Sequence, residues 1–210
     1  EDSSAIHGLI YDKVMKIEEQ TENTLRLSVL VSNELGFPFS LSLEVLYVLS
    51  KVGLSLEFKV KNMGEKKAPF ALGWHPYLKL SGECDAWRIK LEGQTYVDVD
   101  EGPLPTGRTP FVSGTEFDFR TPALIGTKEL DLAIEKAKSG RTELKNGMEG
   151  LVLKQSEEFP YVQFYIPEER DSIAIEPITA ATDSFNRPSL GRIDLEPGDE
   201  WVADCSIEKI

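Results

Sequence analysis

The 210-residue sequence is poor in the residues that build metal sites and disulfide frameworks. It contains two cysteines, Cys84 and Cys205, and two histidines, His7 and His75. Two cysteines this far apart form no metal-binding motif and do not suggest a disulfide-built secreted protein. There is no HExxH, paired CxxC, glycine-rich phosphate loop or GxSxG elbow either. We therefore expect no metal, no other cofactor and a cytoplasmic location.

Positive charge is also scarce, because 23 Lys and Arg stand against 36 Asp and Glu and leave a net charge of -13. Nucleic acids and anionic membrane surfaces are bound by clustered cations. Long apolar runs are missing too: the best candidate, residues 41–49, is interrupted by Ser42 and Glu44. No run approaches the ~18 residues of a membrane span, and we expect no signal peptide. These absences argue against nucleic acid or membrane as a partner.

What the sequence does contain is a series of short stretches in which apolar and polar residues alternate. Residues 25–31, 41–45 and 54–60 are the clearest, and a period of two places every second side chain on one face of a strand. Similar runs lie at 87–91, 150–154, 161–166, 172–175 and 201–207, with turn residues between them. Roughly ten to twelve short strands are typical of a β-sandwich or barrel. We predict one all-β domain, residues 1–210, built as a large antiparallel β-sandwich.

Two stretches depart from this pattern. Residues 128–139 are the only helix-like segment, with weak apolar spacing. Residues 99–125 contain four prolines and three glycines and no strand pattern. Long irregular segments inside a compact domain are often functional, so we expect the second stretch to contribute to a site.

Two polar residues stand out by their setting. His75 lies in Gly73-Trp74-His75-Pro76-Tyr77, where Pro76 favours an extended, rigid backbone around an imidazole that can exchange protons near neutral pH. Glu176 ends the apolar strand 172–175 and precedes Pro177, which we expect to stop the strand. Partial burial there would raise its pKa toward neutrality. A structural histidine in an aromatic corner and a solvated strand-end acid fit these residues as well.

Other residues are less distinctive in isolation. The aromatic residues Trp74, Tyr77, Phe185 and Trp201 could stack on a sugar or belong to the core. His7, near the start of the sequence, and Asp131, one of 36 acidic residues, would be unremarkable without further context.

Several segments together resemble the aldose 1-epimerase (galactose mutarotase-like) family. The strongest match is 62–77, which ends in Gly-Trp-His-Pro-Tyr. The second is 174–186, beginning Ala-Ile-Glu-Pro, followed by 195–201 as a closing turn and last strand. Weaker matches are Ile6-His7-Gly8, Leu104-Pro105-Thr106-Gly107 and Leu130-Asp131. They occur in family order over nearly the whole sequence.

The resemblance implies a galactose mutarotase-like supersandwich that interconverts the α and β anomers of a hexose such as glucose or galactose without a cofactor. His75 would be the general acid that protonates the ring oxygen, and Glu176 the general base that deprotonates the anomeric hydroxyl. His7 would be a second active-site histidine, and Asp131 would bind ring hydroxyls. Trp74 and Tyr77, which flank the acid, would also contact the sugar.

The sequence also departs from the family pattern. Only six residues of the sequence precede His7, so we expect it to lack the section that usually supplies strands and an arginine at the sugar site. Residues 179–185 differ from the well-characterised galactose enzymes. Three alternatives therefore stand beside the epimerase: a non-catalytic carbohydrate-binding protein, a hexose-6-phosphate 1-epimerase, and a glycosidase that pairs Glu176 with Asp131. The second needs a phosphate pocket, for which the candidates are Arg88, Arg108, Arg141, Arg187 and Arg192.

Overall fold

The computed structural model describes residues 7–100, 102, 104–136 and 138–210. In this part of the chain the regular structure is almost entirely antiparallel strand, with two 3₁₀ helices of three residues each, Cys84–Ala86 (η1) and Pro188–Leu190 (η2). The predicted all-β antiparallel fold is confirmed. None of the described helices has the length or the apolar character needed to cross a membrane.

The chain forms two compact units. Unit 1 comprises residues 1–69 and 194–204, and unit 2 comprises residues 70–193 and 205–210. The strand β15 (Glu200–Lys209) contributes its first half to unit 1 and its second half to unit 2. The organisation of residues 1–210 as one domain stays a prediction.

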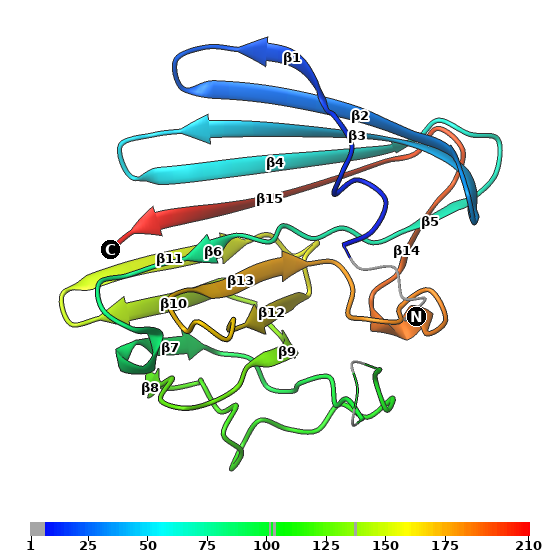
Figure 1. The fold of residues 1–210 in the computed structure, drawn as a ribbon. Helices are drawn as coiled ribbons and strands as arrows, with labels where there is room; N and C mark the ends of the chain where they lie inside the picture. Colours follow the sequence, from blue (N-terminus) through cyan, green and yellow to red (C-terminus); the bar gives the residue numbers. More distant parts are fainter. Residues whose placement is uncertain (1–6, 101, 103, 137) are drawn as a thin grey trace. The chain divides into compact units, whose positions relative to one another are not determined.

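Unit 1 is dominated by long, regular strands (Figure 1). Its sheet runs in the order β1 (Lys16–Gln20), β2 (Thr24–Glu34), β3 (Phe37–Leu49), β4 (Gly53–Asn62) and the first half of β15. The short strands β5 (Ala68–Phe70) and β14 (Ile193–Leu195) pair with each other. The strands β2, β3 and β4 contain residues 25–31, 41–45 and 54–60, so the three clearest predicted strands are confirmed.

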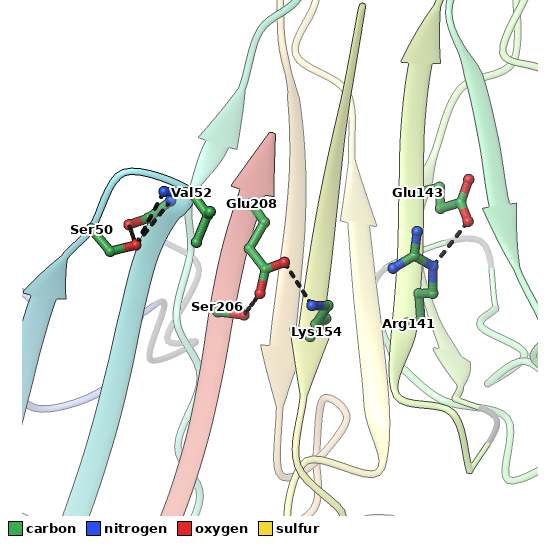
Figure 2. A network of polar contacts seen from close by, with 8 residues as sticks. Ser50, Val52, Arg141, Glu143, Lys154, Ser206 and Glu208 are labelled. Carbon is green, nitrogen blue, oxygen red and sulfur yellow. Dashed lines mark hydrogen bonds and ion pairs between the residues drawn. The ribbon is translucent and has the colours of Figure 1, made fainter. Parts of the chain in front are cut away.

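The register within unit 1 follows the apolar alternation. Leu43 lies opposite Val60, and Val45 lies opposite Phe58, and all four side chains are buried. Because a slip of one residue would turn every side chain of a strand to the other face, this apolar set fixes the pairing of β3 with β4. The tight β3–β4 turn is held by the Ser50 hydroxyl, which accepts hydrogen bonds from the backbone N–H groups of Val52 and Gly53, both at 3.3 Å (Figure 2).

Unit 2 is a β-sandwich. One sheet runs in the order β15 (its second half), β11 (Glu149–Gln155), β10 (Arg141–Asn146), β7 (Arg88–Leu91) and β8 (Ala123–Leu124). The other, which we call the four-stranded sheet, runs in the order β6 (Tyr77–Leu78), β13 (Ile173–Ile178), β12 (Tyr161–Tyr165) and β9 (Asp131–Glu135). Every pairing recorded within these sheets is antiparallel.

Buried apolar side chains from both sheets form the core of unit 2. Ile89 and Leu144 come from one sheet, Phe164 and Ile175 come from the other, and Trp87 is buried with them. Fully burying an aliphatic or aromatic side chain contributes about 1.5–3 kcal/mol. The core therefore anchors β12 and β13 firmly, and it leaves their alternate side chains on the opposite face of the four-stranded sheet.

Charged side chains lie on the sheet of unit 2 that contains β10, β11 and the second half of β15. Lys154 on β11 pairs with Glu208 on β15 at 2.6 Å, and Arg141 pairs with Glu143 on β10 at 2.9 Å (Figure 2). Ser206 also donates a hydrogen bond to Glu208, at 3.3 Å. The Lys154 and Arg141 side chains are 46% and 39% exposed, and ion pairs near the surface contribute little to stability.

Two expectations were wrong. The helix-like segment 128–139 contains β9, because pairing with β12 and burial of Leu132 and Ile134 outweigh local helix propensity. Pro177 does not end its strand, since β13 continues to Ile178. The carbonyl of Pro177 accepts a hydrogen bond from Trp74. The N–H and C=O of one residue face the same neighbouring strand. The N–H that proline lacks would therefore have faced the segment of Trp74, and the pairing of β13 with β12 loses no hydrogen bond. Elsewhere, the described residues of 99–125 are irregular apart from β8 and isolated bridges.

Candidate active site on the four-stranded sheet

The candidate site lies on the face of the four-stranded sheet that points away from the core. Ile173 and Ile175 enter the core, so Ala174 and Glu176 point outward from β13. The register extends this face across the sheet. Gln163 on β12 lies opposite Glu176, and on its other side Gln163 lies opposite Ala133 of β9. The side chains of Glu176, Gln163 and Ala133 are thus placed in one row across three strands.

His75 and Glu176 are in contact on this face. The imidazole Nε2 lies 3.3 Å from the carboxylate Oε1. The Glu176 side chain is only 11% exposed, whereas the His75 side chain is 32% exposed. One member of the pair is therefore nearly enclosed and the other faces solvent. This is a suitable arrangement for moving a proton between a protein group and a bound molecule.

The segment that carries His75 is tied to β13 by backbone hydrogen bonds. The N–H of Leu72 donates to the Thr179 hydroxyl at 2.8 Å, and the N–H of Thr179 donates back to the Leu72 carbonyl at 2.8 Å. The Trp74 N–H donates to the Pro177 carbonyl at 3.1 Å. On the other side of the pair, the Ile175 N–H donates to the Pro76 carbonyl at 3.4 Å. Because these bonds lie on both sides of His75 and Glu176, they hold the imidazole against the carboxylate.

Tyr77 supports the imidazole from the next strand. The rings of His75 and Tyr77 are stacked, with centroids 5.0 Å apart and planes inclined by 27°. Tyr77 itself is 52% exposed. Burial, followed by the neighbouring Tyr165 and Glu176, raises the pKa of its phenol. It is therefore a neutral ring packed against His75 on an open face.

The environment of Glu176 strongly perturbs its carboxyl group. Burial raises its pKa from 4.5 to about 8, and the nearby Asp131 carboxylate adds to the increase. Desolvation and a like charge both disfavour the ionised form. A protonated His75 would act in the opposite direction by stabilising the carboxylate. Glu176 therefore keeps its proton at pH values where a solvated glutamate is ionised.

Asp131 and Gln163 form the second polar element of the site. The Gln163 Nε2 donates to the Asp131 Oδ1 at 2.8 Å. Asp131 is exposed at the start of β9. Gln163 was missed in the sequence. The signal that could have found it is the alternation in 161–166, which turns an amide outward between two buried apolar residues, Val162 and Phe164.

A cleft of about 300 Å³ opens beside this second element. Asp131 and Gln163 supply its polar side. Apolar walls come from the predicted irregular region, with Val99 and Pro105, and from the segment after β13, with Ala181. A polar side with apolar walls suits a small molecule with many hydroxyl groups.

The remaining expected residues are divided between the two units. Trp74 is partly buried beside His75. His7 belongs to unit 1, in an exposed turn with φ of 64°, and its ring centroid is 6.5 Å from that of Tyr11. Its role at a sugar site stays a prediction. In the described part of the chain, no cluster of three or more His, Cys, Asp or Glu could hold a metal ion.

Comparisons with known proteins agree on one family. The family model described as aldose 1-epimerase matches residues 1–208. Human galactose mutarotase is 26% identical over 230 residues, covering 94% of this chain and 67% of its own length. The uncharacterized protein YihR of Escherichia coli is 28% identical over 188 residues, covering 87% of this chain. This chain spans only 61% of the length of YihR.

The fold is shared with solved structures as well. A galactose mutarotase-like protein from Clostridium acetobutylicum superposes with a TM-score of 0.86 at 17% identity. The match covers 98% of this chain and 69% of that one. The fold expected from the sequence, a galactose mutarotase-like β-sandwich, is therefore confirmed.

Proposed function

The chain belongs to the aldose 1-epimerase family, and we propose that it interconverts the α and β anomers of a hexose such as glucose or galactose. The observation that carries this proposal is the contact between His75 and Glu176 at 3.3 Å on an accessible face. An imidazole and a carboxyl group that share a proton are the two groups that anomer exchange requires.

The proposed reaction needs two coordinated proton transfers. His75, in its protonated form, gives a proton to the ring oxygen, while ionised Glu176 takes the proton from the anomeric hydroxyl. The ring C–O bond breaks as the carbonyl forms. Rotation about the bond next to the carbonyl then presents its other face, and the same transfers in reverse close the ring. Each transfer by a positioned side chain is worth typically about 10²–10⁴-fold in rate.

The other site residues are proposed to hold the sugar. Asp131 and Gln163, joined at 2.8 Å, would accept and donate hydrogen bonds to ring hydroxyls. Trp74 and Tyr77, on either side of His75, would pack against the sugar ring. The assignment of His7 as a second histidine of the site rests on its sequence motif.

The setting of the reaction is also inferred. We propose a cytoplasmic enzyme that needs no cofactor. Its two cysteines, Cys84 and Cys205, are buried thiols rather than halves of a disulfide, which fits a reducing compartment. We further propose a small sugar as its partner.

Three of the five arginines suggested for the phosphosugar alternative are already paired with carboxylates. Arg108 is bound by Asp98 through two hydrogen bonds, at 2.7 and 2.9 Å. Arg187 is paired with Asp183, and Arg141 with Glu143 in the other sheet of unit 2. A carbohydrate-binding protein without activity would use Asp131 and Gln163 equally well, but it would not need the acid–base pair.

Polarimetry tests the proposal directly. Freshly dissolved α-D-glucose and α-D-galactose should approach their equilibrium rotation faster with the protein than without it. His75→Ala and Glu176→Gln should each remove about 10²-fold or more of the acceleration, with a circular dichroism spectrum like that of the unchanged protein. A folded sample that accelerates neither sugar would contradict the proposal. Sugar binding in that sample would then indicate a binding protein.

A further inference from the structure

The two walls of the cleft come from segments that are far apart in the sequence. The first wall is an arm made of the described residues of 94–112, whose two runs are bridged at Val99–Pro105 and at Thr95–Phe111. The second wall is the segment that follows β13, residues 179–192, which brings Ala181 to the cleft. A sugar held by Asp131 and Gln163 would lie between these walls, so their spacing would decide how firmly it is held.

Each wall is held in shape by its own hydrogen bonds. In the arm, the Asp98 carboxylate accepts from the Thr106 hydroxyl at 2.6 Å and from the Arg108 guanidinium at 2.7 and 2.9 Å. In the second wall, Arg187 Nε donates to Asp183 Oδ2 at 3.2 Å, and its backbone N–H donates to the Asp183 carbonyl at 3.0 Å. Both walls are therefore locally ordered before any sugar binds.

The walls meet where the Arg187 guanidinium lies against Gly107. A Cβ atom built on Gly107 would lie 2.8 Å from Arg187 Nη1, which is closer than real Cβ atoms approach other atoms. Gly107 also has φ of +88°, a conformation that favours glycine. The absence of a side chain at position 107 thus lets the guanidinium rest on the backbone of the arm.

We propose that Arg187 and Gly107 form a latch that joins the two walls and sets the width of the cleft. Both are then positioning residues for the sugar, because neither belongs to the acid–base pair. The inference rests on the proposed function, since the cleft is taken to hold the hexose. Opening the latch should weaken sugar binding and leave the proton transfers unchanged.

Four variants test the latch: Gly107→Ala, Arg187→Ala, the double variant, and the control Gly114→Ala. Gly114 has a similar φ of +79° but open space around its Cβ position. The two glycine variants therefore share the cost of left-handed backbone, and only Gly107→Ala displaces the guanidinium. Thermal unfolding should show similar losses for both, because the far end of an arginine can move aside cheaply.

The expected result is a change in KM rather than in kcat. Gly107→Ala and Arg187→Ala should each raise KM for the preferred hexose by about fivefold, a size typical of coupled contacting residues. The double variant should raise KM no further, because both changes break the same contact. Gly114→Ala should leave KM within about twofold, and kcat should stay within about twofold in all four proteins.

The contrary results are equally specific. The latch is wrong if Gly107→Ala behaves like Gly114→Ala, or if the effects of Gly107→Ala and Arg187→Ala multiply in the double variant. It is also wrong if Arg187→Ala weakens binding of a hexose 6-phosphate alone, which would make Arg187 an anion-binding residue. Dissociation constants from calorimetry give the same comparison if the unchanged protein binds sugar but does not accelerate mutarotation. In that case only the proposed function fails, and a protein that binds no sugar overturns both.

Discussion

The two faces of the four-stranded sheet are made by alternate residues of the same strands, yet one face forms the core and the other carries the candidate site. On β12, Phe164 is fully buried in the core, while its neighbour Gln163 points to the candidate site. On β13, Ile175 and Glu176 are divided in the same way. The core face supplies the apolar burial that makes the sheet rigid. The other face can therefore keep a desolvated carboxyl group, which is unfavourable in itself, in contact with an imidazole.

Substitutions of two neighbouring residues on β12 should affect stability and activity differently, because the two side chains lie on opposite faces. Phe164→Ala should lower the free energy of unfolding by about 3–5 kcal/mol, because it leaves a cavity in the core. It should change kcat little at a temperature where the protein is folded. Gln163→Ala should cost about 1 kcal/mol or less in stability and raise KM. Chemical denaturation beside initial-rate polarimetry measures both, and a Gln163 variant as unstable as the Phe164 variant would refute the division.

The pH dependence of stability should reveal the free-energy cost of burying the Glu176 carboxyl group. Burial raises the pKa of Glu176 to about 8 from 4.5. Between these pH values the folded protein keeps a proton that the unfolded chain releases, so the free energy of unfolding should fall as pH rises from 4.5 to 8. We expect a fall of roughly 3 kcal/mol. This is below the ceiling of about 5 kcal/mol set by 1.4 kcal/mol per pKa unit, because protonated His75 offsets part of the penalty.

Glu176→Gln is the control for that slope, because a neutral amide has no proton to lose. Urea titrations of both proteins at several pH values should give a smaller fall for the variant. Parallel curves would show that other groups cause the pH dependence.

A variant without the charge of Asp131 should show that this residue influences the acid–base pair. Asp131→Asn takes away a carboxylate that raises the pKa of Glu176. The pKa of Glu176 should fall, and the limb of the pH–rate profile that reports its ionisation should move to lower pH. KM should also rise about tenfold, since hydrogen bonds to a charged group contribute about 1.5 kcal/mol or more. A pH–rate profile that does not shift would show that the charge of Asp131 does not affect the ionisation of Glu176.

Changes at Tyr77 should have the smallest effect. Tyr77→Phe keeps the ring that stacks on His75 and should leave kcat nearly unchanged. Tyr77→Ala removes the stacking, which is worth about 0.5–1.5 kcal/mol, and should lower kcat by about twofold to tenfold. Equal losses in the two variants would assign the effect to the phenol hydroxyl instead of the ring.

How well the fold could be predicted depended on the regularity of each strand. The alternation in β2, β3 and β4 was sufficient, because these strands are eleven, thirteen and ten residues long and most of each repeats one pattern. The strand β10 was missed, since its six residues include only one large apolar side chain, Leu144. The strand β9 was read as helix because its residues have no strong preference until β12 pairs with them.

The sequence by itself determined the antiparallel all-β class and singled out His75 and Glu176 as unusual polar residues beside strands. Only the tertiary structure decided that they are in contact, because β13 must pair with the segment before β6 to bring them together from 101 positions apart. Gln163 shows the same limit. Its outward direction follows from alternation, but its place between Glu176 and Ala133 depends on the register of three strands. Local pattern fixes which way a side chain points, and long-range pairing fixes what it meets.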